Sequence, residues 1–86
     1  MQKDMIKKRV LDLINQESGR SYKGLEESCS MEHDLCMDSL EMVGLQIAIE
    51  DEFRFEFDPM NDDFEKCFAT YGNLCTYVEE KIRETR

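Results

Sequence analysis

The feature that most constrains the fold is the start of a helix in the middle of the chain. Asp38 and Glu41 stand three residues apart, which is the spacing of a capping box, in which two side chains satisfy backbone N–H groups that a helix start leaves unpaired. Apolar residues at helical spacing follow directly. The pattern predicts a helix from Asp38 to about Phe53, with Ser39 on its first turn.

The N-terminal segment predicts a second helix, from about Lys3 to Glu17, with Gly19 as its stop. One face of this segment is apolar, and it consists of Ile6, Val10, Leu13 and Ile14. Residues 18–37 show no period, so we expect a long ordered loop. Loops of this length in small domains are usually functional. The residues expected to hold this loop are Leu25, Met31 and Leu35.

The C-terminal third predicts a turn at Asp58-Pro59, because proline disfavours a helical residue before it. A short helical turn is expected over about 61–67. Thr70 is the expected N-cap of a last helix from about Tyr71 to Glu84. The apolar stripe of that helix consists of Leu74, Tyr77, Val78 and Ile82.

The predicted fold class is all-α, in one domain over residues 1–86. We expect a small four-helix bundle, with three main helices plus one short helix, and a long first loop. Arg54-Phe55-Glu56-Phe57 alternates in polarity as a strand does, but four residues without a partner strand make no sheet.

The central helix has two apolar faces. At about 100° per residue, Met42, Leu45, Ile49 and Phe53 share one arc. Leu40, Val43 and Ile47 share the roughly opposite arc. A small bundle buries one face, so we expect the second face to be left for a docking partner. The alternative is that a central helix buries both faces against different neighbours.

The charge balance points to basic partners. The chain has 20 acidic and 11 basic residues and a formal charge of −9. This argues against nucleic acid and anionic membrane surfaces, which require clustered Lys and Arg. Plain solubility is the alternative reason for the acidity. No apolar run has the length of a membrane span and the N-terminus lacks a signal-peptide pattern, so we expect no membrane insertion and a cytoplasmic location.

Ser39 is the candidate functional residue. The positive end of a helix dipole favours a phosphate ester on its hydroxyl. The sequence offers no GxSxG elbow and no spaced acid and base set around it, so we expect an attachment point and no enzyme activity. Met37, next to the motif, is expected to touch an attached group or a partner. Tyr71 and Tyr77 are expected in the core and at its rim.

The four cysteines are expected to be free thiols acting as small buried or half-buried apolar groups. They are Cys29, Cys36, Cys67 and Cys75. A zinc site would use Cys29, His33, Cys36 and one distant cysteine, but the spacing C-x3-H-x2-C contains no compact ligand pair. We expect no metal, with a metal-binding or redox domain as an alternative. The simpler interpretation of His33 is a loop residue.

Together these features resemble the acyl carrier protein family. The segment from Asp34 to Leu40, DLCMDSL, resembles the family attachment motif D-L-G-x-D-S-L. Glu50-Asp51-Glu52-Phe53 resembles the acidic end of the family's second helix, and Phe57 completes an apolar pair with Phe53. Thr70-Tyr71-Gly72-Asn73-Leu74, followed by Tyr77-Val78, is similar to the family's final-helix pattern. The resemblance runs from the first helix to Ile82.

The resemblance implies a carrier whose serine, here Ser39, receives 4′-phosphopantetheine from coenzyme A, with Asp38 and Leu40 beside it. The terminal thiol of that arm holds acyl intermediates as thioesters. The expected function is a shuttle between enzymes of fatty acid, polyketide or related lipid biosynthesis. The expected partners are a phosphopantetheinyl transferase and acyl synthetases, ketosynthases, reductases or acyltransferases that have basic docking patches. The carrier itself is expected to be a monomer.

By the family pattern the second helix docks on these partners. The matching positions are Leu40, Glu41, Val43, Ile47, Glu50 and Asp51. In members that enclose the acyl chain it lies between helices, and the candidate lining residues are Leu45, Ile49, Phe53 and Leu74.

Four departures from the family pattern favour a specialised carrier over a housekeeping one. Cys36 replaces the glycine two residues before the Asp-Ser pair, Gly44 replaces an acidic residue, and Asn73 replaces an aspartate. The segment between Phe57 and Thr70 is about three residues longer than is usual. The alternative function is an unmodified helical protein-interaction module with a carrier-like fold.

Overall fold

Four stretches of the chain form helices in the computed structural model, which describes residues 3–58, 60 and 63–84. These are α1 (Lys3–Ser18), α2 (Ser39–Phe53), α3 (Phe64–Cys67) and α4 (Tyr71–Glu84). Within the described residues there is no strand, and Ser30 and Thr70 form one isolated antiparallel bridge. The predicted all-α bundle, with three main helices and one short one, is confirmed. None of the helices within these ranges has both the length and the apolar character to cross a membrane.

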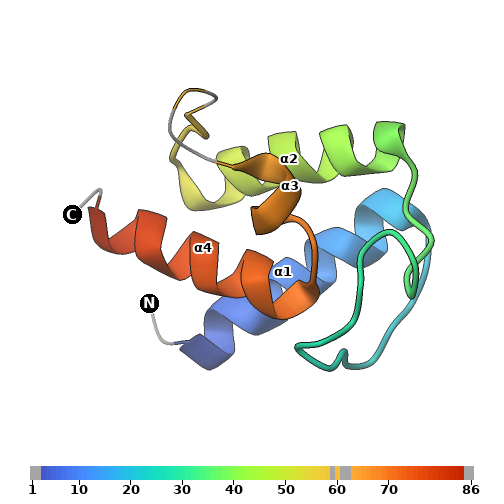
Figure 1. Cartoon of the computed structure of the whole chain (residues 1–86). Coiled ribbons are helices and arrows are strands. Elements are labelled where there is room, and N and C mark those ends of the chain that lie inside the picture. The colour runs from blue at the N-terminus through green and yellow to red at the C-terminus, as the bar shows by residue number, and fades with distance from the viewer. Residues whose placement is uncertain (1–2, 59, 61–62, 85–86) are drawn as a thin grey trace.

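Helix α1 is the centre of the packing, because it contacts both α2 and α4, while α3 packs against α4. In Figure 1, α1 runs in one direction and α2 and α4 run back across it, and the long loop closes the end where α2 begins. The apolar faces predicted for the main helices meet in a single core. Fully buried core residues include Ile6, Val10, Ile14, Leu45, Ile49, Leu74 and Val78.

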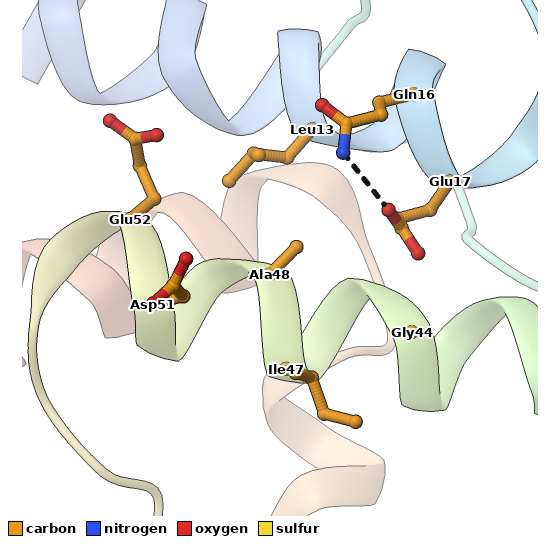
Figure 2. Close-up of a pocket in the computed structure, with 8 residues that line it drawn as sticks. All are labelled: Leu13, Gln16, Glu17, Gly44, Ile47, Ala48, Asp51 and Glu52. Carbon is orange, nitrogen blue, oxygen red and sulfur yellow. Dashed lines mark hydrogen bonds between the residues drawn. The ribbon is translucent and has the colours of Figure 1, made fainter.

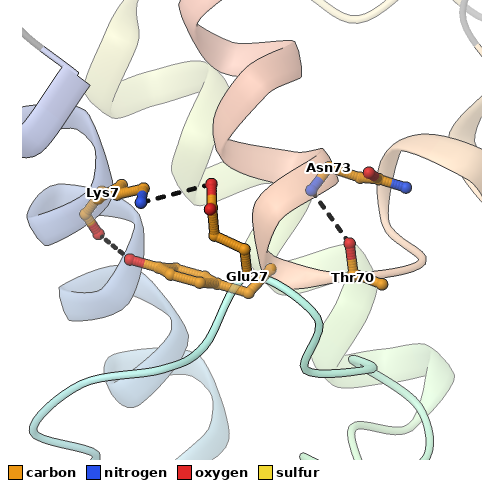
Figure 3. Close-up of polar contacts among 5 residues, drawn as sticks. Lys7, Glu27, Thr70 and Asn73 are labelled. Carbon is orange, nitrogen blue, oxygen red and sulfur yellow. Dashed lines mark hydrogen bonds and ion pairs between the residues drawn. The ribbon is translucent and has the colours of Figure 1, made fainter.

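The helix ends follow the local sequence. Gly19 has a φ of +68° after α1, the left-handed conformation that favours glycine. The hydroxyl of Thr70 accepts a hydrogen bond from the Asn73 N–H at 3.1 Å, so the predicted N-cap of α4 is confirmed (Figure 3). The short helix begins at Phe64; residues 61 and 62 of its predicted range, and Pro59 of the predicted turn, lie outside the described residues.

The loop before α2 is held against the start of α4 by backbone hydrogen bonds. Three of them join the loop to the chain around Thr70: Met31 N to Ala69 O at 3.1 Å, Tyr71 N to Cys29 O at 2.9 Å and Gly72 N to Glu27 O at 2.9 Å. The Lys7 ammonium lies 3.4 Å from the Glu27 carboxylate (Figure 3). Met31 and Leu35 are buried and Leu25 is half-buried. The prediction of a long, ordered loop held by these residues is confirmed.

Gly72 allows this close approach of loop and helix. A Cβ atom at that position would lie 2.7 Å from the Glu27 Cβ and 2.8 Å from the Glu27 carbonyl oxygen. No ordinary side chain fits there while the hydrogen bond to Glu27 is kept. Glycine at the first turn of α4, unfavourable by helix propensity, is therefore required by packing.

Aromatic rings fill the space between the segment after α2, the short helix α3 and α4. Phe55 and Phe57 are both buried, while Arg54 and Glu56 between them are exposed. The Phe57 ring stacks on Tyr77 with centroids 5.2 Å apart and an interplanar angle of 7°. The alternating segment thus forms no strand but places two rings in the core. Tyr71 and Tyr77 are both buried, as predicted.

Candidate functional site

Ser39 is the first residue of α2 and is exposed. The capping box predicted around it is present, since Asp38 Oδ1 accepts from the Glu41 N–H at 2.8 Å and Glu41 Oε1 accepts from the Asp38 N–H at 3.1 Å. The cap fixes where the helix begins, and so fixes where the serine hydroxyl lies. That hydroxyl is at the positive end of the helix dipole and open to an incoming group.

The approach to Ser39 is a turn anchored by buried side chains on alternate residues. Leu35 and Met37 are buried, and the Met37 N–H donates to the Met31 carbonyl at 3.1 Å. The Met37 side chain is part of the core and also lines the hollow beside Ser39, so its contact with an attached group or a partner stays a prediction. Burial of Met37 leaves the following residues, Asp38 and Ser39, exposed.

Cys36 lies between those two anchors with a φ of +53° and an exposed side chain. A left-handed conformation favours glycine and costs an L-residue roughly 1–2 kcal/mol. The chain therefore keeps the left-handed turn with a cysteine in place of the motif's glycine, at the cost of backbone strain. The prediction of buried or half-buried free thiols is confirmed for Cys29, Cys67 and Cys75 and is wrong for Cys36.

The turn carrying His33 is closed by local hydrogen bonds. The Asp34 carboxylate accepts from the Ser30 N–H at 2.7 Å, and the Ser30 hydroxyl accepts from the His33 N–H at 3.0 Å. His33 is an exposed loop residue, as its simpler interpretation predicted. Over residues 3–58, 60 and 63–84, no group of three His, Cys, Asp or Glu side chains is placed to hold a metal ion.

An apolar stripe on α2 faces solvent. Leu40 is 82% exposed, Val43 53% and Ile47 59%, whereas Leu45 and Ile49 on the other face are fully buried. We call these three exposed residues the exposed α2 stripe. The alternative in which α2 buries both faces is wrong. Met42 and Phe53, predicted on the core face, are half-buried against the core.

The three acidic residues predicted for docking lie in different environments. Glu41 is half-buried and serves the capping box. Glu50 is half-buried, and its carboxylate accepts from the Phe57 N–H at 2.8 Å, so it holds the segment that follows α2. Asp51 is exposed. The periodicity of α2 placed Glu50 beside the stripe but contained no sign of its bond to Phe57.

Two adjoining hollows lie near Ser39, and only the first is lined by Ser39 itself. The first, which we call the Ser39 hollow, has a volume of about 480 Å³ and is lined by Glu32, Met37, Asp38, Ser39 and Met42. The second, which we call the aromatic groove, has a volume of about 250 Å³ and is lined by Glu32, Met42, Val43, Gln46, Phe64, Glu65 and Phe68. They share Glu32 and Met42, so one surface path leads from the serine to the rings of the α3 region.

Sequence reasoning missed the aromatic groove. Phe64 and Phe68 stand four residues apart, a spacing that puts both on one side of a helical turn, and this was the available signal. Of the four candidate lining residues, Leu45, Ile49 and Leu74 are fully buried in the core, and Phe53 is half-buried against it. They line neither the Ser39 hollow nor the aromatic groove.

A third groove, of about 640 Å³, lies between α1 and α2, away from Ser39 (Figure 2). Its lining includes the carboxylates of Glu17, Asp51 and Glu52, and Gln16 donates a hydrogen bond to Glu17 at 3.3 Å. Gly44 faces Glu17, whose carboxylate occupies the space that a Cβ at Gly44 would take. The missing side chain at Gly44 thus leaves room for Glu17 from the neighbouring helix.

No protein-family model matches this chain. The function is therefore inferred from the residues around Ser39.

Proposed function

We propose that this chain is an acyl carrier protein in which Ser39 is the attachment point of a 4′-phosphopantetheine arm. The observation that carries the proposal is the exposed serine at the first residue of α2, with an exposed apolar stripe that starts at the next residue. The left-handed backbone conformation of Cys36 adds support, because the acyl carrier attachment motif has glycine at this position. The carrier has no turnover of its own on this proposal.

The residues around Ser39 fit such an arm. The hydroxyl is exposed, and the Ser39 hollow lies beside it with the methionine side chains of Met37 and Met42 in its lining. A phosphate on Ser39 would lie at the positive end of the α2 dipole. When attached, the arm supplies a terminal thiol that carries an acyl group as a thioester.

Attachment is a phosphoryl transfer onto Ser39. The serine Oγ forms a new P–O bond with the phosphate nearest the pantetheine arm of coenzyme A, and the pyrophosphate P–O bond breaks. Adenosine 3′,5′-bisphosphate leaves with the electron pair of that bond, and the serine proton passes to a base on the transferase. What this chain supplies is position: the capping box of Asp38 and Glu41 holds the hydroxyl at a fixed helix end.

Partners are proposed to dock on the exposed α2 stripe. Leu40, Val43 and Ile47 supply apolar contact, and the exposed Asp51 supplies charge at the far end of the stripe. With a net charge of −9, association with basic surfaces is steered by charge. The partner classes are a phosphopantetheinyl transferase and the enzymes that load, extend, reduce or transfer acyl groups in lipid or polyketide synthesis, in the cytoplasm.

The test is the intact mass of the protein after incubation with coenzyme A and a broad-specificity phosphopantetheinyl transferase. We expect a gain of one arm per chain. Ser39→Ala should abolish the gain, and Ser21→Ala, at an exposed loop serine, should leave it unchanged. An unchanged mass of the folded wild-type protein, or a modified Ser39→Ala variant, would remove the proposal.

The alternative, an unmodified interaction module, is favoured by the same exposed α2 stripe, because a docking surface does not need a prosthetic group. The two functions differ in what Ser39 does. The module binds its partner equally well with Ser39→Ala and gains no mass from the transferase.

A further inference from the structure

We infer that the carried group is a short or single-ring, uncharged acyl group that rests in the aromatic groove at the surface. This inference depends on the proposed attachment to Ser39. It names the class of cargo from the size, lining and charge of the groove.

The aromatic groove is within reach of a group tethered at Ser39. Met42, which lines both hollows, lies three residues after Ser39 on α2. Gln46, which also lines the groove, lies seven residues after Ser39, which is about 10 Å along a helix axis. An arm that folds back along α2 from the serine therefore delivers its acyl end to the rings of Phe64 and Phe68.

The groove has a closed floor. Phe68 is buried, and its ring lies 5.5 Å from the Phe57 ring, centroid to centroid. Phe57 also contacts Phe64 at 5.4 Å and stacks on Tyr77 at 5.2 Å. A long chain entering the interior must displace this set of packed rings, and packed cores resist such overfilling. The cargo is thus confined to the groove.

The volume of the groove limits the size of the cargo. Its 250 Å³ lies below the range of about 300–1,000 Å³ that encloses drug-sized ligands. It corresponds to about eight waters at roughly 30 Å³ each. A chain of a few methylenes or one ring fills that space, and a long chain extends past it into solvent.

The lining also selects against negative charge. Both ionisable residues that line the groove, Glu32 and Glu65, are acids, and both are exposed. The remaining lining is mostly apolar, with Met42, Val43 and the two phenylalanines. A cargo with a free carboxylate meets two like charges and an apolar wall, whereas a neutral chain or ring meets only favourable contacts.

The experiment loads defined groups onto the intact chain. A broad-specificity transferase attaches arms from amide-linked analogues of hexanoyl-, phenylacetyl-, hexadecanoyl- and succinyl-coenzyme A, with the unacylated arm as reference. Mass spectrometry reports loading. The thermal midpoint and the NMR shifts of the Met42 methyl and the Phe64 and Phe68 rings report whether the cargo occupies the groove.

We expect hexanoyl and phenylacetyl to shift the groove signals and raise the midpoint by a few degrees over the unacylated arm. Succinyl should do neither, and hexadecanoyl should add nothing beyond hexanoyl. Glu65→Lys should give the succinyl form the groove shifts that it lacks in the wild type. Glu80→Lys, an exposed charge reversal on α4, should not.

The two proposals fail in different ways. Absence of loading at Ser39 removes the proposed function and this inference with it. Successful loading overturns the inference alone if the groove signals stay unchanged with every cargo. The same holds if hexadecanoyl gives the largest stabilisation with shifts at Leu45, Ile49 and Leu74, or if wild-type protein holds succinyl as well as hexanoyl.

Discussion

Asp38 and Glu41 exchange hydrogen bonds, each carboxylate accepting from the other's backbone N–H, at 2.8 and 3.1 Å. Ser39 lies between them in the sequence, so the pair fixes the position of the proposed attachment point through local geometry alone. The serine hydroxyl takes no part in the capping box, which leaves it available for modification.

Asp38→Ala should destabilise the protein by about 1 kcal/mol, because the Glu41 N–H loses its acceptor. Asp38→Asn should cost much less, since an asparagine oxygen accepts the same hydrogen bond. Urea unfolding measures both. Asp51→Ala, at an exposed position in the last turns of α2, is the control and should stay within about 0.5 kcal/mol of wild type. Equal losses for Asp38→Asn and Asp38→Ala would contradict the capping role.

Cys36→Gly should stabilise the protein by roughly 1 kcal/mol, because it relieves an L-residue at a φ of +53°. Lys23→Gly, at an exposed loop position outside the set of positive-φ residues, should be neutral or destabilising. The measurement is the urea midpoint under reducing conditions. A destabilised Cys36→Gly would show that the thiol contributes more than the turn costs.

Stability should fall as the pH rises from about 9 to about 11. Burial raises the pKa of the Cys75 thiol from 9.0 to about 11, and burial also raises the pKa of Tyr71, whose hydroxyl donates to the Lys7 carbonyl at 2.6 Å. The unfolded thiol ionises near 9, so between these values the unfolded chain binds fewer protons than the folded one and is favoured. At about 1.4 kcal/mol per pK unit, the Cys75 contribution is roughly 2 to 3 kcal/mol.

Urea midpoints across this pH range measure that loss. Cys75→Ala should flatten the dependence between pH 9 and 11, although a smaller side chain lowers stability at every pH. Cys36→Ala, which removes an exposed thiol, should keep the wild-type slope. Parallel curves for the wild type and Cys75→Ala would refute the assignment to Cys75.

The helices and the two faces of α2 could be predicted from the sequence because both follow from local periodicity and capping. Thr70 and Asp38 cap the helices that follow them, as their spacing to later residues indicates. The roles of Met37 and Glu50 could be predicted only in part, because they depend on contacts outside the local sequence pattern. Met37 is anchored through Met31, and Glu50 holds Phe57, seven residues away.

The aromatic groove also lies beyond local reasoning. It is lined by residues of α2 and of the α3 region together, so Phe64 and Phe68 become lining residues through tertiary packing. Sequence spacing puts those two rings on one side but does not say which helix they face. The proposed cargo class depends on this groove and therefore required the structure.

Leu40→Ser should lower kcat/KM for modification of Ser39 by the transferase about tenfold, equivalent to about 1.4 kcal/mol, with no loss of stability. Leu40 is the most exposed member of the exposed α2 stripe, so its change removes partner contact and no core packing. Met5→Ser, at an exposed apolar position on α1, is the matched control and should leave the rate unchanged. The rate should also fall with added salt, because the partner is steered by charge. Equal losses for both variants would place docking elsewhere.

Two helix glycines should respond oppositely to the same substitution. Gly44→Ala should stabilise the protein by about 1 kcal/mol, because alanine is the better helix former and the new Cβ meets the end of the flexible Glu17 side chain, which can move.

Gly72→Ala gains the same propensity but places its Cβ 2.7 Å from the Glu27 Cβ and 2.8 Å from the Glu27 carbonyl oxygen. That carbonyl accepts the Gly72 N–H at 2.9 Å, so the loop must shift and lose the bond. We expect a net loss of more than 1 kcal/mol, of the size that overpacking costs. Urea unfolding of both variants decides the matter, and hydrogen exchange at Gly72 reports whether the bond to Glu27 opens. A stabilised Gly72→Ala would mean that the loop does not rest on α4 as described, and a destabilised Gly44→Ala would mean that Glu17 is held rigidly in the groove between α1 and α2.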